Sequence, residues 1–124
     1  MNNISQNLLP YRNFLAQQKA AIAKEIQALE SQNCFDDANI LKIRLNIFEV
    51  FETVASADEK QSSTWADFCA RYEPRFDTLT APWNARLASA VRNSDTKTRF
   101  IEEIKLSTAK RIREAFLSFR GDEA

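Results

Sequence analysis

Apolar residues recur along the chain at the three- and four-residue spacing of an α-helix, and no segment shows the alternation typical of a half-buried strand. The clearest case is near the N-terminus, where apolar residues repeat every seven positions: Leu8, Leu15, Ile22 and Leu29. This pattern predicts a first helix from Leu8 to Ser31, with Asn7 as its N-cap and Pro10 in its first turn. Its apolar residues form one seam against a neighbouring helix.

A second helix is predicted from Asp37 to Ser56, and it is apolar on nearly every side. The connector before it, residues 32–35, is short enough for a tight antiparallel hairpin. Asp36 and Asp37 suit an N-cap and the positive end of the helix dipole. A helix that is apolar nearly all round is typical of the centre of a bundle, whereas residues 58–63 are polar and are expected to form a solvated loop.

A capping box at Thr64 and Asp67 predicts the start of a third helix, which carries a large aromatic face. Pro74 removes an intrahelical hydrogen bond and disfavours the α region at Glu73. We therefore expect this helix to kink or break near Pro74.

Two further helices are predicted after this break. A short helix restarts at residues 80–82 and ends near Asn93, with three residues pointing inward: Trp83, Leu87 and Val91. The last helix runs from Asp95 to Arg120 and ends at Gly121, the usual C-terminal residue type. Its apolar stripe contains Ile101, Ile104, Thr108, Ile112, Ala115 and Phe119. Residues 1–124 are thus predicted to form a single all-α domain, an antiparallel bundle of three long helices with a kinked, short helical insertion.

Charge and composition restrict the partners and the compartment. The chain carries 17 Lys plus Arg and 17 Asp plus Glu, so no overall field draws nucleic acid or an anionic membrane. The longest apolar run, Ala20–Ala23, is too short to span a bilayer, and the first residues have no secretory pattern. We expect a cytoplasmic protein that binds neither membrane nor nucleic acid. Cys34 and Cys69 are interpreted as reduced thiols that fill space.

The chain lacks the residues that much catalytic chemistry requires. It contains no His, and its only glycine is Gly121, which excludes imidazole catalysis and glycine-rich phosphate loops. Glu49 and Glu52 are the best carboxylate pair for a divalent metal, but only half of the paired carboxylate pattern of all-α nucleotide pyrophosphohydrolases is present. We interpret this pair as a solvated helix edge and predict no catalytic residue, no metal and no cofactor.

Two cations interrupt apolar helix faces. Arg44 projects into the middle of the apolar arc of its helix, and Lys105 does the same on the last helix. Three arrangements would accommodate these cations. Each cation forms an internal salt bridge, or each extends along its stem to solvent. In the third arrangement, both bind a carboxylate or phosphate compound in a pocket lined by Tyr72 and Trp83.

One face of the last helix is a candidate interface. Lys110 and Arg113 share this face with Leu106 and Leu117, which lie away from the main apolar stripe. Nucleic acid would explain the charges but not the leucines, whereas leucines between long charged stems are typical of a protein–protein contact. The sequence therefore predicts binding to a protein partner or to a second copy, as a homodimer.

Three stretches, Glu30–Phe51, Ala81–Trp83 and Ile101–Leu106, resemble small all-helical bacterial proteins of unknown function. The resemblance implies a helical fold and brings no catalytic or binding residues with it. The residues themselves favour a non-enzymatic helical protein–protein interaction or structural module. The alternative is a small-anion-binding or metal-assisted, pyrophosphohydrolase-like enzyme with a pocket around Arg44 and Lys105.

Overall fold

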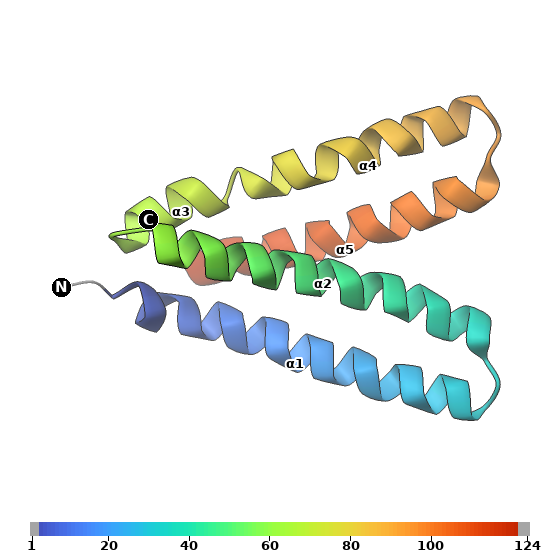
Figure 1. Cartoon of the computed structure of the whole chain (residues 1–124), viewed down its shortest axis with the longest axis horizontal. Helices are drawn as coiled ribbons and strands as arrows, with labels where there is room; N and C mark the ends of the chain where they lie inside the picture. Colours follow the sequence, from blue (N-terminus) through green and yellow to red (C-terminus); the bar gives the residue numbers. More distant parts are fainter. Residues whose placement is uncertain (1–2, 122–124) are drawn as a thin grey trace.

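Five helices follow one another along residues 3–121, the part of the chain that the computed structural model describes. They are α1 (Ile4–Ser31), α2 (Phe35–Gln61), α3 (Trp65–Tyr72), α4 (Arg75–Arg92) and α5 (Thr96–Arg120). The helices run alternately up and down, and α3 and α4 together occupy the place of one helix, so that α1 begins and α5 ends at the same end (Figure 1). The predicted all-α helical bundle is confirmed, with no strand in this part of the chain.

Both long helices of the first hairpin extend beyond their predicted ends. Helix α1 begins at Ile4 rather than Leu8, and Pro10 consequently lies in the second turn instead of the first. Ile4 is 2% exposed and packs in the core, so tertiary burial stabilises the additional turn. Helix α2 continues to Gln61 through residues predicted as a solvated loop, because Asp58 is buried and its carboxylate lies 2.8 Å from the guanidinium of Arg75.

The start of α2 also differs from the prediction. Its N-cap is Cys34, whose side chain makes no capping hydrogen bond. Asp36 and Asp37 lie in the first turn instead, where their charges face the positive end of the helix dipole. The dipole argument for these two residues is therefore confirmed, and their role as N-cap is wrong.

The predicted break at Pro74 separates α3 from α4, but the chain passes through it with little change of direction along the bundle (Figure 1). Glu73 keeps α-helical angles (φ −57°, ψ −43°), and helix α4 begins at once at Arg75, so the predicted restart at residues 80–82 is wrong. Pro82 lies inside α4. Val91, predicted to point inward, is 51% exposed, because the buried face of this last turn falls on Ala90 instead.

Helix α5 has the predicted ends and a shifted apolar face. The side chain of Asp95 accepts a hydrogen bond from the backbone N–H of Thr98 (3.1 Å), and Gly121 follows the helix with a positive φ of 74°. Phe119 is 41% exposed, whereas Phe116 is fully buried. Phe116 replaces Phe119 in the core because at this end α5 faces α3 as well as α1.

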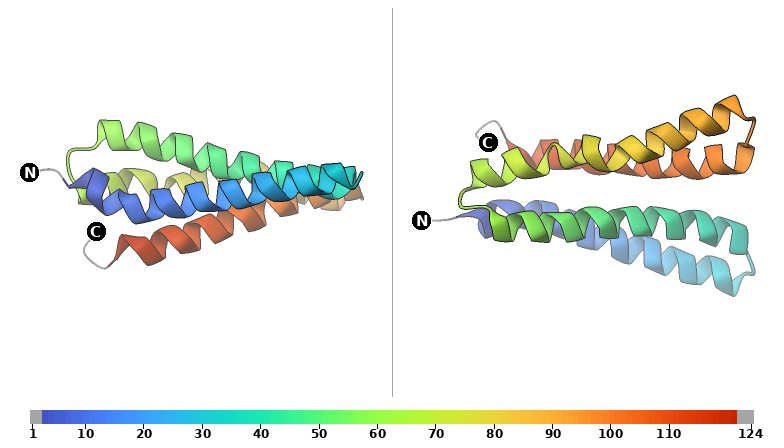
Figure 2. Two further views of the ribbon diagram at one scale, coloured as in Figure 1. Left: turned by 90° about the horizontal axis from the view of Figure 1, so that it is seen from below. Right: turned by 45° about the horizontal axis from the view of Figure 1, so that its top comes forward.

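The aromatic core lies at the end of the bundle where α3 is packed. It contains Tyr11, Phe51, Phe68, Tyr72, Phe76 and Phe116. At the opposite end, the α1–α2 hairpin and the α4–α5 hairpin move apart towards their loops, as Figure 1 and the right view of Figure 2 show. Two aromatic residues near these loops, Phe35 and Phe100, are 53% and 52% exposed. Within residues 3–121, no helix is both long enough and apolar enough to cross a bilayer.

Candidate functional site

The four residues predicted to line an anion pocket lie in three different places. Tyr72 is fully buried in the aromatic core, where its hydroxyl lies 2.5 Å from that of Tyr11 and donates a hydrogen bond to the carbonyl of Phe51 (3.2 Å). No space for a ligand adjoins it in the described cavities. Tyr72 is therefore a core residue.

Lys105 and Trp83 do come together, between α4 and α5. The Lys105 Nζ lies 5.9 Å from the centre of the Trp83 ring and 3.1 Å from Oε2 of Glu102. Glu102 is only 3% exposed, and its other oxygen lies 3.5 Å from Nε of Arg86. Of the three alternatives for Lys105, the structure supports an internal salt bridge, because a carboxylate this deeply buried requires a cationic neighbour.

Arg44 lies elsewhere, in a cavity of about 280 Å³ bounded by α1, α2 and α5. Its Nη1 donates a hydrogen bond to Oγ1 of Thr108 (3.2 Å), across 64 residues of sequence. No carboxylate of residues 3–121 lies within ion-pair distance of this guanidinium. Of the three alternatives for Arg44, the internal salt bridge is therefore ruled out within the described residues, since the facing helix places a hydroxyl there.

A second arginine lines the same cavity, and the sequence arguments missed its role. Arg111 lies three residues after Thr108 on the same side of α5, and its Nη2 donates to Oε1 of Gln18 (2.9 Å). The spacing alone indicates that Thr108 and Arg111 share a face of α5. It does not indicate that this face meets Arg44, because the rotation of α5 against α2 is set by packing.

The walls of this cavity combine apolar and charged side chains. Ala21 and Ile22 come from α1, and Leu41 and Phe48 come from α2. Glu25 is the one acidic side chain among its lining residues, and it is exposed. With Arg44 and Arg111, the lining carries two positive charges and one negative charge. We call this site the arginine cavity.

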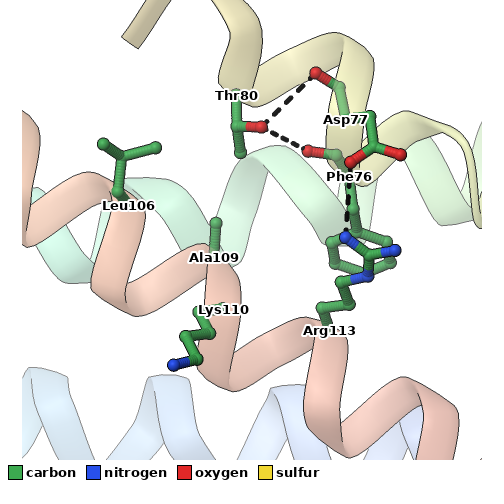
Figure 3. Close-up of a pocket in the computed structure, with 7 residues that line it drawn as sticks. All are labelled: Phe76, Asp77, Thr80, Leu106, Ala109, Lys110 and Arg113. Atoms are coloured by element: carbon green, nitrogen blue, oxygen red, sulfur yellow. Dashed lines mark hydrogen bonds and ion pairs between the residues drawn. The ribbon is translucent and has the colours of Figure 1, made fainter. Parts of the chain in front are cut away.

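The predicted interface residues of α5 line a groove against α4 (Figure 3). Leu106, Lys110 and Arg113 form its α5 side, and its volume is about 140 Å³. The other lining residues are Phe76, Asp77, Thr80 and Ala109. The face is therefore not as open as expected, because α4 covers part of it and leaves Leu106 half-buried. Leu117, further along α5, is 40% exposed.

The charges of the groove include both signs. Nη1 of Arg113 lies 3.3 Å from Oδ1 of Asp77, whose side chain is 76% exposed. Lys110 is exposed and has no ion pair within the described residues. We call this surface, together with Leu117, the α4–α5 groove.

The other candidate groups do not gather into a site within the described residues. Oε1 of Glu52 lies 2.7 Å from Nζ of Lys19, while Glu49 is exposed. Across residues 3–121, no three His, Cys, Asp or Glu side chains gather in a group that could hold a metal ion. Both cysteines are free thiols, and burial raises the pKa of Cys69 to about 11.

No family model, curated protein or solved structure matches this chain. The geometry of the arginine cavity and of the α4–α5 groove is therefore the basis for a functional proposal.

Proposed function

We propose that the protein is a non-enzymatic helical interaction module that associates with a second copy of itself through the α4–α5 groove. The observation that carries this proposal is the combination of a half-buried leucine in an open groove, Leu106, with an exposed leucine further along the same helix face, Leu117. A small apolar patch bordered by long charged stems is typical of a protein contact surface.

The charges of the groove favour a second copy over an unrelated partner. Lys110 is exposed and unpaired within the described residues, and Asp77 keeps most of its side chain in solvent. A two-fold arrangement brings the same patch of each subunit together, so Lys110 of one copy can pair with Asp77 of the other. A surface with both charge signs is complementary to itself in this arrangement.

The non-enzymatic part of the proposal is supported by the state of the acidic side chains. Glu52 is paired with Lys19, Glu102 with Lys105, and Asp58 with Arg75. Carboxylates engaged in such pairs hold side chains of the fold together and are not free to contact a substrate.

The expected association is weak. Burying two leucines contributes about 3–6 kcal/mol before the cost of association. A dissociation constant of about 10–100 μM corresponds to a net of about 5.5–7 kcal/mol. The leucines therefore supply only part of it, and the two Lys110–Asp77 pairs of a two-fold contact, with the apolar surface around them, are expected to supply the rest of a weak, non-obligate dimer.

Sedimentation velocity between about 1 and 100 μM tests the proposal. We expect a monomer–dimer equilibrium for the native chain and a monomer for Leu117→Glu and for Leu106→Glu with Leu117→Glu. Leu9→Glu is the matched control, because Leu9 is also an exposed leucine (52%, against 40% for Leu117) but lies on α1 and outside the groove. Circular dichroism shows that each variant is folded.

A charge exchange gives a second test that does not disturb the leucines. Lys110→Glu should weaken the dimer, and Lys110→Glu combined with Asp77→Lys should restore it. A native chain that stays monomeric at about 100 μM would contradict the proposal, as would a dimer that persists in the folded leucine variants.

A further inference from the structure

We propose that the arginine cavity binds a small organic anion, a carboxylate or phosphate group on a short apolar body, between the guanidinium groups of Arg44 and Arg111. The cavity is bounded by α1, α2 and α5 and shares no lining residue with the α4–α5 groove. This inference therefore does not depend on self-association.

The one hydrogen bond that Arg44 makes within the described residues goes to a neutral group, the hydroxyl of Thr108. The hydroxyl of Thr108 donates its proton to the carbonyl of Ile104 (2.7 Å), so its oxygen is available to accept the hydrogen bond from Arg44. One neutral acceptor does not compensate a half-buried guanidinium, which has five N–H groups in a planar fork. A carboxylate or phosphate in the cavity would supply the missing charge and could accept two parallel hydrogen bonds.

Arg111 provides the second cation from the opposite wall. Its hydrogen bond to Gln18 ties α5 to α1 and orients the side chain at the cavity. Arg111 is exposed, so it can meet a ligand that enters from solvent. Glu25 also lines the cavity and repels an anion. The two arginines and Glu25 together leave a local excess of one positive charge.

The apolar walls restrict the body of the ligand. Ile22, Leu41 and Phe48 offer hydrocarbon surface next to the guanidinium of Arg44. A volume of about 280 Å³ is close to the lower end of the range of small-molecule pockets, roughly 300–1,000 Å³. These features fit a single ring or a short chain with one anionic group.

Nuclear magnetic resonance titrations of the ¹⁵N-labelled full chain test this inference with four probes. Phenyl phosphate and benzoate carry the proposed head group and an apolar ring, benzamide has the same ring without the charge, and inorganic phosphate has the charge without the ring. We expect saturable shifts of the Arg44 and Arg111 Nε–H signals with both aromatic anions. Affinity for benzamide and for inorganic phosphate should be at least about tenfold lower.

Substitutions of the two arginines and of Glu25 separate effects on binding from effects on folding. Arg44→Met and Arg111→Gln should each weaken binding of benzoate about tenfold or more, since each removes a charge-assisted hydrogen bond. Glu25→Gln should strengthen it, because a repulsive charge is removed. Lys105→Met is the control cation, as Lys105 is paired on the other side of α5 and should not affect binding. Arg44→Met should fold, because it strands no carboxylate.

The inference is overturned if none of the probes shifts the two arginine signals at concentrations up to about 10 mM. It is also overturned if benzamide binds as well as benzoate, or if folded Arg44→Met and Arg111→Gln bind benzoate as the native chain does. Equal affinity for inorganic phosphate and for phenyl phosphate would overturn the proposal that the ligand carries an apolar body. If the cavity accepts only an acidic side chain of a partner protein, none of the four probes will bind, and the inference is overturned.

Discussion

At the residue scale, the two tyrosines of the core show how polar atoms are accommodated in an aromatic cluster. The Tyr72 hydroxyl donates to the carbonyl of Phe51 and therefore accepts from Tyr11. Both rings pack edge-on against Phe116, with centroid distances of 5.2 Å for Tyr11 and 5.0 Å for Tyr72. The hydrogen bonds offset the cost of burying two hydroxyl groups.

The same burial predicts a loss of stability at alkaline pH. Burial raises the pKa of Tyr11 and of Tyr72 above the ordinary phenol value, so the folded state keeps both protons when the unfolded chain begins to lose them. Their contribution to the free energy of unfolding is complete below about pH 10 and declines as the pH rises towards the folded pKa values. Urea unfolding at about pH 8.5, 10 and 11 measures this decline.

Tyr72→Phe isolates the tyrosine contribution from that of Cys69, whose raised pKa acts in the same direction. The variant should lose less of its stability between about pH 8.5 and 11 than the native chain does. Equal losses, or phenolate absorption of both tyrosines in the folded protein near pH 10, would contradict this account.

At the scale of the helices, local capping signals define several helix ends. Oγ1 of Thr64 accepts a hydrogen bond from the backbone N–H of Asp67 (3.0 Å), and the Asp67 carboxylate accepts one from the backbone N–H of Ser63 (3.1 Å). Reciprocal bonds of this kind satisfy N–H groups that have no partner within the helix. They matter here because α3 has only eight residues and precedes a proline break.

We expect Thr64→Ala to lower the free energy of unfolding by about 1 kcal/mol, because the first turn of α3 loses its side-chain acceptor. Ser63→Ala is the matched control, since only the backbone of Ser63 takes part in the cap. Urea unfolding compares the two variants with the native chain. Equal stability of all three would show that the cap does not hold this helix in place.

Helix ends without a local signal were not predictable in the same way. Asn3 and Asn7 are the same residue type, and the N-cap of α1 is Asn3 rather than the predicted Asn7, although its side chain makes no capping hydrogen bond. The polar residues after Ala57 are typical of a loop. Both helices continue because one residue of each additional segment, Ile4 or Asp58, is buried against a distant part of the chain. A helix is extended when tertiary contacts compensate for weak local preference.

At the scale of the whole molecule, the core is concentrated at one end. Phe116 is fully buried and contacts the rings of Tyr11, Phe68, Tyr72 and Phe76. Phe100, near the start of the same helix, is 52% exposed. Helix α5 starts at the end of the bundle where the two hairpins diverge (Figure 1). Stability should therefore depend strongly on the aromatic end and little on the opposite end.

Phe116→Ala should destabilise the fold by about 3–5 kcal/mol, because it removes transfer free energy and leaves a cavity. Phe100→Ala is the matched control on the same helix and should change the free energy of unfolding by about 0.5 kcal/mol or less. Equilibrium unfolding in urea distinguishes the two. Comparable losses for both variants would mean that Phe100 makes contacts which its exposure does not indicate.

Local sequence accounts for the helical class, the capping box at Thr64 and the break at Pro74. Each of these depends on residues at most four positions apart, and helix geometry brings such residues together without reference to the rest of the chain.

Tertiary packing accounts for which surfaces these helices expose and which distant groups they bring together. Arg44 meets Thr108 across 64 residues, and Arg111 meets Gln18 across 93. The leucine face of α5 is partly covered because α4 packs beside it. The rotation and crossing of helices are set by the interlocking of side chains from segments far apart in sequence. Periodicity shows which residues share a face, but that interlocking decides what the face meets.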